Sequence, residues 1–512
     1  MTATLAARLR ADLTTAQFTV PTLTALWGSA ADEALFRGHR VPALRALRSQ
    51  QKPAATLARL FVLGLPVAAE ALESALPTLG VAGAAELGLV AAEDGDIRPL
   101  LDLRPYSFTD QHGDGSWWIA SDLGELALGR ALREDHVLGV GGASMTLSTL
   151  MIQTPVDSVL DLGTGCGIQA MHASRHARRV VATDISERAL QIAALNAAVN
   201  GIESIEFRHG SLYEPVHGER FDQIVSNPPF VITPRVEGVP AYEYRDGGMV
   251  GDGIVEAVIR GAAEHLTPQG VAQLLGNWEY RGSVHAFDRV RAWLDSVGND
   301  TVGLDGWIIE REVQDAALYA ETWIRDGGIR PGDDFDALYD AWLNDFAARD
   351  VSQVGFGYVT LRRPDAHSPA PRQRMERQLG PLGHNPAGLG AHLAACLAAA
   401  DRLDALTDSE LAATALTVAA DVTEERHYWP GDADPTVMLL RQGGGFARTV
   451  TLDTALAAVV GASDGSLSVA AICAAIGQLL DVDAEQLTAE ILPRLRELVE
   501  TGILQLPEGT DR

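Results

Sequence analysis

The sequence predicts an α/β protein whose centre is a seven-stranded, mainly parallel sheet, and two observations carry that prediction. From about Trp117 onward, short apolar segments alternate with helical segments, which is the order typical of a parallel sheet. Polar or glycine-rich residues follow the first, second and fourth apolar segments, at strand ends where such sheets bind ligands. The predicted strands are Ser158–Leu162, Val180–Ala182, Ile205–Arg208, Gln223–Ser226, Val271–Leu275, Trp307–Glu310 and Gly357–Leu361.

The composition is that of a soluble protein with several domains. The chain has 512 residues, of which 47% are apolar and 21% charged, so large hydrophobic cores can form. Its net charge of −28 argues against nonspecific wrapping of nucleic acid, because that requires clustered cations that displace counterions. A local basic site stays compatible with this charge.

Neither a disulfide framework nor a metal centre is expected. Cys166, Cys396 and Cys473 are widely separated and form no CxxC pair, which favours a reducing compartment and no bound metal. The N-terminus lacks the basic start and long apolar core of a signal peptide. The longest Ala- and Leu-rich runs, such as Leu389–Ala400, are too short to span a bilayer. We therefore predict a cytoplasmic location.

Residues 1–105 are predicted to form a small helical domain. Pro42 and Pro53 stand where the first-turn prolines of helices stand. Beyond this region, the aromatic pair Trp117 and Trp118 is expected to pack between the helical domain and the sheet.

Six cations gather in one stretch of this N-terminal region, from Ala34 to Ala69. No acidic residue occurs from Ala34 to Ala69. At spacings of i, i+3 and i+7, Arg45, Arg48 and Lys52 would share one face of a helix. The pattern indicates either a solvated helix face or a docking patch for RNA or another anionic partner. The six are Arg37, Arg40, Arg45, Arg48, Lys52 and Arg59.

Shifts in composition divide the rest of the chain. The sheet-containing domain is predicted over 106–366, with an acidic and aromatic helical insert at about 315–350 before its last strand. Residues 363–372 have the composition of a linker. A linker and helical segment is predicted over 367–435, followed by a module over 436–512. The three helices and strand expected in this module resemble a winged-helix module, a class that binds nucleic acid or protein.

The first chemical motif is a glycine loop after the first predicted strand. That strand ends in Asp161, and glycines at alternate positions let the backbone approach a ligand without an intervening Cβ. The spacing GxGxG and the Asp before it disfavour a dinucleotide pyrophosphate and suit a cationic ligand. Asp184 ends the next strand and can accept both hydroxyls of a ribose. The candidate residues of this site are Asp161, Gly163, Thr164, Gly165, Gly167, Asp184 and Ile185.

The second motif is Asn227-Pro228-Pro229-Phe230, directly after the fourth predicted strand. The two prolines fix the backbone, so the side-chain oxygen of Asn227 and the carbonyl oxygen of Pro228 can accept both protons of a planar NH2 group. Such a nitrogen is a poor nucleophile, because its lone pair is delocalised. Two fixed acceptors orient it for in-line displacement and stabilise its developing positive charge. Phe230 is expected to offer a face on which a flat amide or base stacks.

With these motifs, the sequence resembles the class I S-adenosylmethionine-dependent methyltransferases that carry an Asn-Pro-Pro-aromatic signature. The resemblance covers roughly His136–Arg363 and implies a Rossmann-like seven-stranded core with S-adenosylmethionine as cofactor. Asn227–Pro234 and the glycine-rich segment Arg245–Gly253 look most like HemK-type enzymes, which methylate the glutamine of a GGQ motif in translation release factors. The upstream segment His136–Thr146 looks more like that of ribosomal RNA methyltransferases with the same motif.

The resemblance also implies further cofactor contacts. Family members often have an Asp after the third strand that meets the adenine amino group. This sequence has Ser211 and Leu212 at that place. Ser211 would be the neutral partner of the adenine.

Three hypotheses about function follow. The first is methylation of a glutamine side-chain amide in a translation factor or ribosomal protein. The second is methylation of an amino group of adenine or guanine in RNA or DNA, supported by the six cations and the winged-helix-like module. The third is a noncatalytic S-adenosylmethionine-binding protein, against which the intact Asp161, Asp184 and Asn227 argue.

Overall fold

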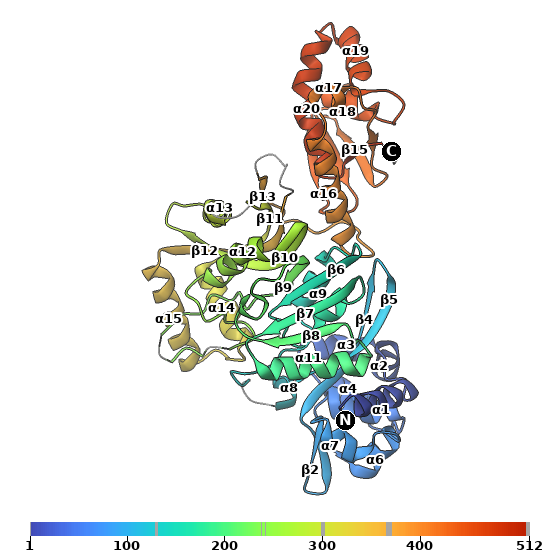
Figure 1. Cartoon of the computed structure of the whole chain (residues 1–512), viewed down its shortest axis with the longest axis vertical. Helices are drawn as coiled ribbons and strands as arrows, with labels where there is room; N and C mark the ends of the chain where they lie inside the picture. Colours follow the sequence, from blue (N-terminus) through green and yellow to red (C-terminus); the bar gives the residue numbers. More distant parts are fainter. Residues whose placement is uncertain are drawn as a thin grey trace. The chain divides into compact units, whose positions relative to one another are not determined.

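The computed structural model describes residues 2–128, 132–236, 238–240, 242–297, 303–364 and 371–507. The chain divides into two compact units, of which unit 1 comprises Met1–Met151 and Pro155–Arg377 and unit 2 comprises Ile152–Thr154 and Gln378–Arg512. Figure 1 follows the chain through both. The predicted domain boundary at 366 falls outside the described residues.

In the described part of the chain, the central sheet of unit 1 has eight strands rather than the predicted seven, in the order β13-β11-β12-β10-β9-β6-β7-β8. All seven predicted strands are present, and β13 lies parallel to β11 beyond the predicted linker. The sequence of β13, Gln-Arg-Met-Glu-Arg, has no apolar alternation, so its pattern does not predict a strand. The strands are β6 Val156–Leu162, β7 Ala177–Asp184, β8 Ile205–His209, β9 Phe221–Ser226, β10 Leu266–Arg281, β11 Asp305–Asp315, β12 Val351–Arg362 and β13 Gln373–Arg377.

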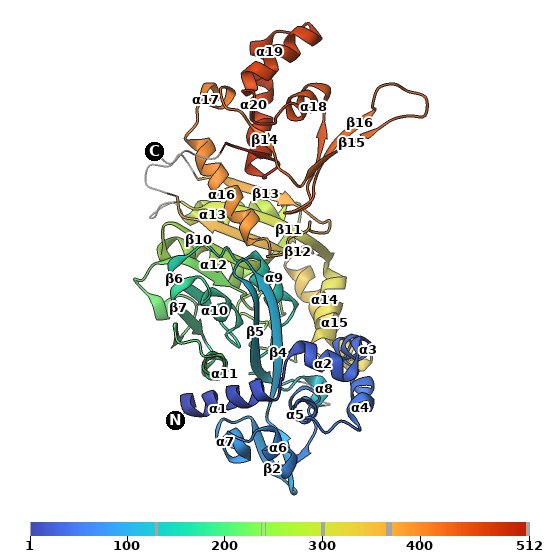
Figure 2. The same ribbon diagram turned by 90° about the vertical axis from the view of Figure 1, so that its right-hand side faces the viewer.

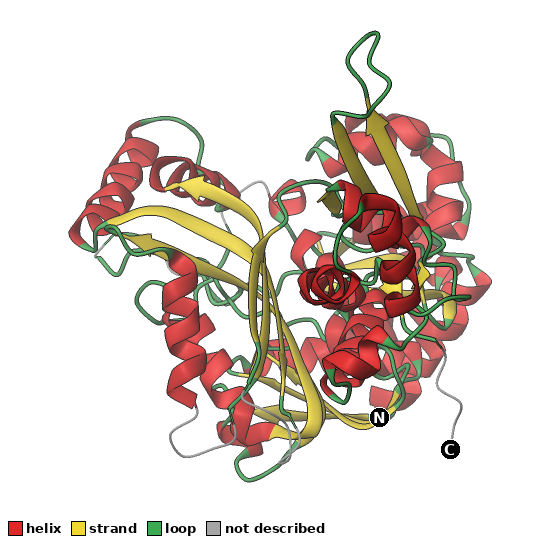
Figure 3. Cartoon of the chain, turned by 90° about the horizontal axis from the view of Figure 1, so that it is seen from above, coloured by secondary structure: helices red, strands yellow, loops and turns green. Residues whose placement is uncertain are grey.

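The register of the sheet brings the motif-bearing strand ends together. β6 is parallel to both β7 and β9, and Leu162 pairs with Thr183 on one side and Ser226 on the other. The glycine loop, Asp184 and Asn227 therefore follow neighbouring strands at the same edge. β12 is antiparallel to both β10 and β11. Figure 3 shows the twist of this sheet, with its strands in yellow.

Helices in the connections between the strands cover the sheet. Helices α10 and α11 pack on β6, β7 and β8, whereas α9, α12 and α13 pack on β10. The predicted insert before the last strand consists of α14 and α15, which pack on each other and on β12. The bounds are α9 Gly142–Leu150, α10 Ile168–Ala173, α11 Glu187–Asn200, α12 Gly253–His265, α13 Ala286–Val297, α14 Ala316–Asp326 and α15 Asp333–Ala348.

The N-terminal region is mainly helical, with a small sheet and a long hairpin. Figure 2 shows the hairpin of β4 and β5 beside the central sheet. Its elements are α1 Thr2–Thr15, α2 Val20–Trp27, α3 Ser29–Phe36, α4 Val41–Leu47, α5 Pro53–Leu57, the π-helical turn η1 Ala58–Val62, β1 Val67–Ala68, α6 Ala69–Ala75, α7 Gly80–Glu86, β2 Val90–Glu93, β3 Asp96–Pro99, β4 Leu101–Asp110, β5 Gly113–Asp122 and the short helix α8 Glu125–Leu128.

A separate N-terminal helical domain is not confirmed, because this region shares one hydrophobic core with α10 and α11. Helix α1 lies beside α11 (Figure 1). The side chains of Asn196 and Asn200 on α11 accept hydrogen bonds from the β5 amides of Ala120, at 2.7 Å, and Trp118, at 3.0 Å. The Trp118 indole N–H donates to the Phe18 carbonyl at 2.6 Å. The predicted packing of the tryptophan pair between the N-terminal region and the sheet domain is thus confirmed.

Arg45, Arg48 and Lys52 do not share the predicted helix face. Helix α4 ends at Leu47, and Lys52 caps the following helix α5, so Lys52 does not lie on one helix with Arg45 and Arg48. The helix is interrupted between Arg48 and Lys52, and Pro53 begins a new helix. Arg45, Arg48 and Lys52 are exposed, and we call them the α4–α5 cations.

Three of the six cations have partners within the protein. Arg40 donates to the Leu63 carbonyl at 3.2 Å, and Arg59 donates to the carbonyl of Gln50 at 2.8 Å. Arg37 lies 3.8 Å from a carboxylate on the preceding turn of its helix. These contacts tie Arg40 and Arg59 to the fold of the N-terminal region.

Unit 2 has its own hydrophobic core, formed largely by α18, α19 and α20. A winged-helix arrangement is not confirmed, since the sheet of β15, β16 and β17 precedes these helices and the closing strand β18 pairs with β14. Figure 2 shows the hairpin of β15 and β16 extending from this unit. The elements are α16 Gly390–Asp404, α17 Asp408–Ala412, β14 Thr417–Val418, β15 Val422–His427, β16 Val437–Gln442, β17 Thr449–Leu452, α18 Thr454–Gly461, α19 Val469–Leu480, α20 Ala484–Glu500 and β18 Leu504–Gln505.

Two features are absent from the described residues. None of their helices is long and apolar enough to cross a membrane. Nor do they contain a group of three or more His, Cys, Asp or Glu side chains able to hold a metal ion.

Candidate active site

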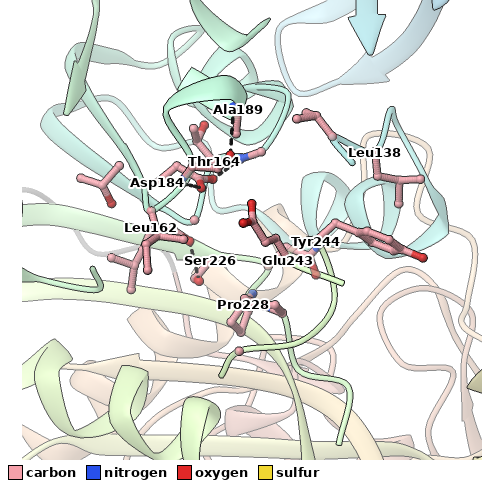
Figure 4. A pocket seen from close by; sticks show the side chains of 18 of the residues that line it. Leu138, Leu162, Thr164, Asp184, Ala189, Ser226, Pro228, Glu243 and Tyr244 are labelled. Carbon is pink, nitrogen blue, oxygen red and sulfur yellow. Dashed lines mark hydrogen bonds between the residues drawn. The ribbon is translucent and has the colours of Figure 1, made fainter. Parts of the chain in front are cut away.

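A cavity of about 410 Å³ lies at the carboxyl ends of β6, β7 and β9. It is large enough for a nucleotide-sized ligand. The loops that follow these strands line it, together with segments 136–139 and 243–248. Figure 4 shows labelled side chains of this lining. Of the residues predicted to bind a cofactor, those that line the cavity are Gly163, Thr164, Gly165, Asp184, Ile185, Ser211, Leu212 and Asn227.

The glycine loop adopts a conformation that its sequence permits. Gly165 has a φ of +55°, and no atom lies within 4 Å of where its Cβ would be. Gly167 has a φ of +87° at the N-cap of α10, and a Cβ there would lie 2.9 Å from the Cβ of Ala193 on α11. Gly165 therefore leaves the backbone open to a ligand, while Gly167 allows close packing of the loop on α11.

Asp161 lies beneath the loop and does not line the cavity. It is fully buried, and its Oδ2 accepts hydrogen bonds from the Thr164 hydroxyl at 2.5 Å and the Ala170 amide at 2.9 Å. In the described part of the chain its Oδ1 has no hydrogen-bond partner. Burial raises the pKa of Asp161 to about 7, against the lowering effect of these two hydrogen bonds. A positive charge nearby would favour the ionised carboxylate.

Asp184 lines the cavity at the end of β7 and holds two loops. Its Oδ2 accepts the Gly165 amide at 2.8 Å, and its Oδ1 accepts the Ser186 amide at 2.9 Å. Burial raises the pKa of this carboxyl group, and the backbone hydrogen bonds oppose that rise. A carboxylate has about four acceptor positions, so Asp184 keeps the capacity to bind ligand hydroxyls. The neighbouring Ile185 is 64% exposed at the rim.

The loop after β8 forms the next part of the wall. Ser211 and Leu212 line the cavity, as the family resemblance implies. The Gly210 amide donates to the Asp184 main-chain carbonyl at 3.0 Å, which fixes this loop beside β7. Leu212 has a φ of +47°, a conformation uncommon for a residue other than glycine.

Asn227, Pro228 and Pro229 line the cavity directly after β9. The Asn227 Oδ1 is buried and has no hydrogen-bond partner among the described residues. Buried polar atoms are nearly always paired, so an unpaired acceptor at a cavity wall indicates a position that a ligand donor satisfies. The preceding Ser226 donates its hydroxyl to the Leu162 carbonyl at 2.7 Å and thereby ties the motif to β6.

Phe230 does not take the predicted position. It is 8% exposed and is absent from the cavity lining. Its ring packs at 5.4 Å from that of Phe356 on β12 and at 6.4 Å from that of Trp323 on α14. The expected stacking face is therefore covered, because the insert helix α14 and strand β12 bring aromatic rings against Phe230.

The structure adds cavity residues that the motifs do not identify. Glu243 and Tyr244 line the wall opposite the glycine loop, and both side chains are drawn in Figure 4. His136, to which the sequence assigns no role, also lines the cavity, and burial lowers its pKa. The Val231 amide donates to the Arg245 carbonyl at 2.9 Å, so the chain returns beside the motif 14 residues later. The glycine-rich stretch after residue 245 is the one sequence signal of this return.

These features define a class of site. A glycine loop and a carboxylate follow adjacent parallel strands, as in Rossmann-like nucleotide-binding domains. The unpaired Asp161 Oδ1 suits a cationic ligand, and the open backbone at Gly165 suits close approach. The residues present thus fit S-adenosylmethionine, which carries a nucleoside and a positively charged sulfonium.

Comparison with known proteins identifies the domain more closely. Residues 140–285 match the Methyltransferase small domain, and residues 15–100 match a Domain of unknown function. Unit 1 therefore contains a HemK-like class I methyltransferase domain, and S-adenosylmethionine is its cofactor.

Curated relatives match the same region. The chain is 37% identical over 149 residues to the ribosomal protein uL3 glutamine methyltransferase of Bradyrhizobium diazoefficiens, covering 27% of this chain and 46% of the relative. It is 40% identical over 134 residues to a release factor glutamine methyltransferase of Xylella fastidiosa, covering 25% and 49%. It is 33% identical over 138 residues to the ribosomal RNA small subunit methyltransferase C of Escherichia coli, covering 27% and 35%. The chain thus spans about half, or less, of the length of these relatives.

Solved structures include similar chains. A methyltransferase from Pyrococcus furiosus is 15% identical, with a TM-score of 0.26, and the match covers 43% of this chain and 80% of that one. A geranyl diphosphate methyltransferase in complex with SAM is 13% identical, with a TM-score of 0.27 and coverages of 43% and 84%.

Proposed function

We propose that this protein transfers the methyl group of S-adenosylmethionine to the side-chain amide nitrogen of a glutamine in a translation factor or ribosomal protein. The observation that carries this proposal is the buried, unpaired Oδ1 of Asn227 at the wall of the cavity. Together with the Pro228 carbonyl, it can accept both protons of a planar NH2 group. The nitrogen is then held with its lone pair directed toward the methyl donor.

Each wall of the cavity has a part in this reaction. Asp184 and the open glycine loop would hold the nucleoside, and Asp161 supplies negative charge beneath the loop. Ser211 and Leu212 would line the adenine position. When bound, S-adenosylmethionine supplies a methyl group on a positively charged sulfur.

The charge of the cavity favours a protein acceptor over a nucleic acid. Asp184, Glu243 and Asp246 line it, whereas none of the described lining residues is Lys or Arg. Of these three carboxylates Asp246 is paired with Arg235, so a nucleotide phosphate would be repelled by Asp184 and Glu243, whereas a neutral amide would not. Two of the relatives described above are named as glutamine methyltransferases, which supports the same choice.

Methylation of RNA is the second candidate, favoured by the relative named as a ribosomal RNA methyltransferase. Under this candidate the exposed α4–α5 cations would contact the phosphates of the substrate. Under the first candidate they would contact an acidic protein surface or only solvent. A cytoplasmic location, where translation factors and ribosomes meet the enzyme, stays a prediction.

The acceptor is tested with labelled S-adenosylmethionine and three purified substrates: a release factor, ribosomal protein uL3 and ribosomal RNA. We expect label in a glutamine of one of the proteins, identified by digestion and mass spectrometry. Label in the RNA alone would exclude the glutamine proposal and support the second candidate. Cofactor binding without transfer to any substrate would instead support a noncatalytic protein.

A further inference from the structure

Glu243 stands on a segment that is fixed beside the catalytic motif. The Val231 amide, one residue beyond that motif, donates to the Arg245 carbonyl at 2.9 Å. The Glu243 amide donates to the Glu134 carbonyl, also at 2.9 Å. Hydrogen bonds to two different segments therefore hold the main chain on either side of the Glu243 side chain.

Tyr242 and Arg245, which flank the cavity-lining pair Glu243 and Tyr244, lie outside the cavity lining and anchor the segment. Tyr242 is 4% exposed and Arg245 is 6% exposed. The Arg245 guanidinium donates to the Trp323 carbonyl and to the Asp326 carboxylate, each at 2.8 Å. Between these buried neighbours, the Glu243 side chain is directed into the cavity (Figure 4).

Glu243 differs from the other carboxylates of the lining in having no partner. Asp184 accepts two backbone amides, and Asp246 forms an ion pair with Arg235. Within the described residues, the Glu243 carboxylate takes part in no hydrogen bond or ion pair. Both of its oxygens are thus available to a ligand, whereas each oxygen of Asp184 already accepts one backbone amide.

Methyl transfer to an amide nitrogen creates a positive charge and a proton to be released, and an unpaired carboxylate beside the nitrogen assists with both. As the nitrogen–carbon bond forms and the carbon–sulfur bond breaks, the electron pair of the broken bond goes to sulfur and the nitrogen becomes positive. The nitrogen must then lose a proton to give the neutral N-methyl amide. Asn227 and Pro228 offer neutral oxygen acceptors, which orient the amide but cannot provide a countercharge. A carboxylate in a site from which the acceptor has displaced water supplies it.

We propose that Glu243 is a catalytic residue, whose carboxylate stabilises the positive charge on the acceptor nitrogen and takes the released proton. Water then carries the proton to solvent through the open mouth of the cavity. This role rests on the proposed function, and it extends the catalytic machinery beyond the Asn-Pro-Pro motif to the segment that pairs with it.

The test compares Glu243→Gln and Glu243→Asp with Glu264→Gln, a change of an exposed glutamate on α12 outside the cavity lining. Rates are measured with a purified release factor and, in parallel, with ribosomal protein uL3. We expect Glu243→Gln to lower kcat about 100-fold, as loss of a proton acceptor does. The acceptor KM and the Kd of S-adenosylmethionine should change less than about threefold, because glutamine keeps the size and hydrogen bonding of the side chain. Glu243→Asp should retain an intermediate kcat, and Glu264→Gln should match the wild type.

The outcomes separate this role from the proposed function. An active wild-type protein with an equally active Glu243→Gln variant would overturn the role of Glu243 alone. A weaker Kd for S-adenosylmethionine at unchanged kcat would also overturn it, since Glu243 would then be a cofactor ligand. A wild-type protein that labels neither substrate protein would overturn the proposed function and the role together.

Discussion

Replacing Asp161 by asparagine tests how the buried carboxylate interacts with the cofactor. The raised pKa of about 7 means that Asp161 is largely protonated in the free protein at pH 6 and largely ionised at pH 8. A positively charged ligand above it binds the ionised form more tightly. The cofactor should therefore bind less tightly as the pH falls, and binding near neutral pH should release protons.

The magnitude follows from the fraction of Asp161 that is ionised. With a pKa of about 7, that fraction is about one tenth at pH 6 and about nine tenths at pH 8. The apparent Kd scales inversely with the competent fraction, so it should be about tenfold weaker at pH 6 than at pH 8. Asparagine cannot ionise, so the Kd of S-adenosylmethionine for Asp161→Asn should vary less than about twofold between pH 6 and pH 8.

The assay is isothermal titration calorimetry with S-adenosylmethionine at pH 6, 7 and 8, in buffers of different ionisation enthalpy. The comparison of the two proteins separates Asp161 from the nearby His136, whose pKa shift comes from burial, Asp122, Arg188 and Asp135 and not from Asp161. Asp157→Asn, a change of an aspartate that is 79% exposed, is the matched control and should behave as the wild type. Equal pH dependence in wild type and Asp161→Asn, or no proton release by the wild type, would refute the reasoning.

The same pKa shift predicts how the stability of the cofactor-free protein changes with pH. The folded-state pKa of Asp161 lies above its ordinary value of 3.8, so the folded protein favours the protonated form. This contribution is complete below about pH 4 and is lost as the pH rises through about 7. Ionised Asp161 costs the free protein about 4 kcal/mol, which a bound cation offsets.

Other predictions concern packing and charge in unit 1. Gly167→Ala should destabilise unit 1 by about 2–4 kcal/mol, because the new Cβ would contact Ala193 and the residue has a positive φ. Gly163→Ala should cost about 1 kcal/mol, because Gly163 also has a positive φ but no atom lies close to the new Cβ. Urea denaturation followed by far-UV circular dichroism measures both. Similar losses for the two would contradict the packing argument. Trp118→Phe should cost about 1 kcal/mol in the same assay, because the Phe18 carbonyl loses its donor; an unchanged midpoint would contradict this. Neutralising the α4–α5 cations together should weaken RNA binding and reduce its salt dependence if RNA is the substrate. Unchanged RNA affinity in filter binding at several salt concentrations would contradict that candidate.

The central sheet could be predicted because its information is local. Each predicted strand is a short apolar run, and the ligand-binding residues follow strand ends directly, as at Gly163 and Asn227. Once the parallel order is assumed, those ends must meet at one edge. The sequence does not predict strand β13, because its residues alternate neither in polarity nor in size. The strand is held partly by long-range contacts such as the hydrogen bond that the Trp307 indole N–H donates to the Glu376 carboxylate at 2.6 Å.

The parts of the site that were missed depend on long-range contacts. Phe230 is covered by rings from α14 and β12, which no local pattern places near it. Glu243 reaches the cavity because the chain pairs back on itself after a loop. The shared core of the N-terminal region was missed for the same reason, since Asn196 satisfies the backbone of a strand 76 residues away. Such contacts leave no periodic signal in the sequence.

The central claim is that Asn227 orients a planar NH2 group for methyl transfer. Single-turnover transfer by Asn227→Ala, with S-adenosylmethionine bound beforehand and the glutamine-containing acceptor protein in excess, tests it most directly. We expect transfer to fall by at least about 100-fold, while the Kd of the cofactor changes less than about threefold. Transfer at the wild-type rate with intact cofactor binding would contradict the claim.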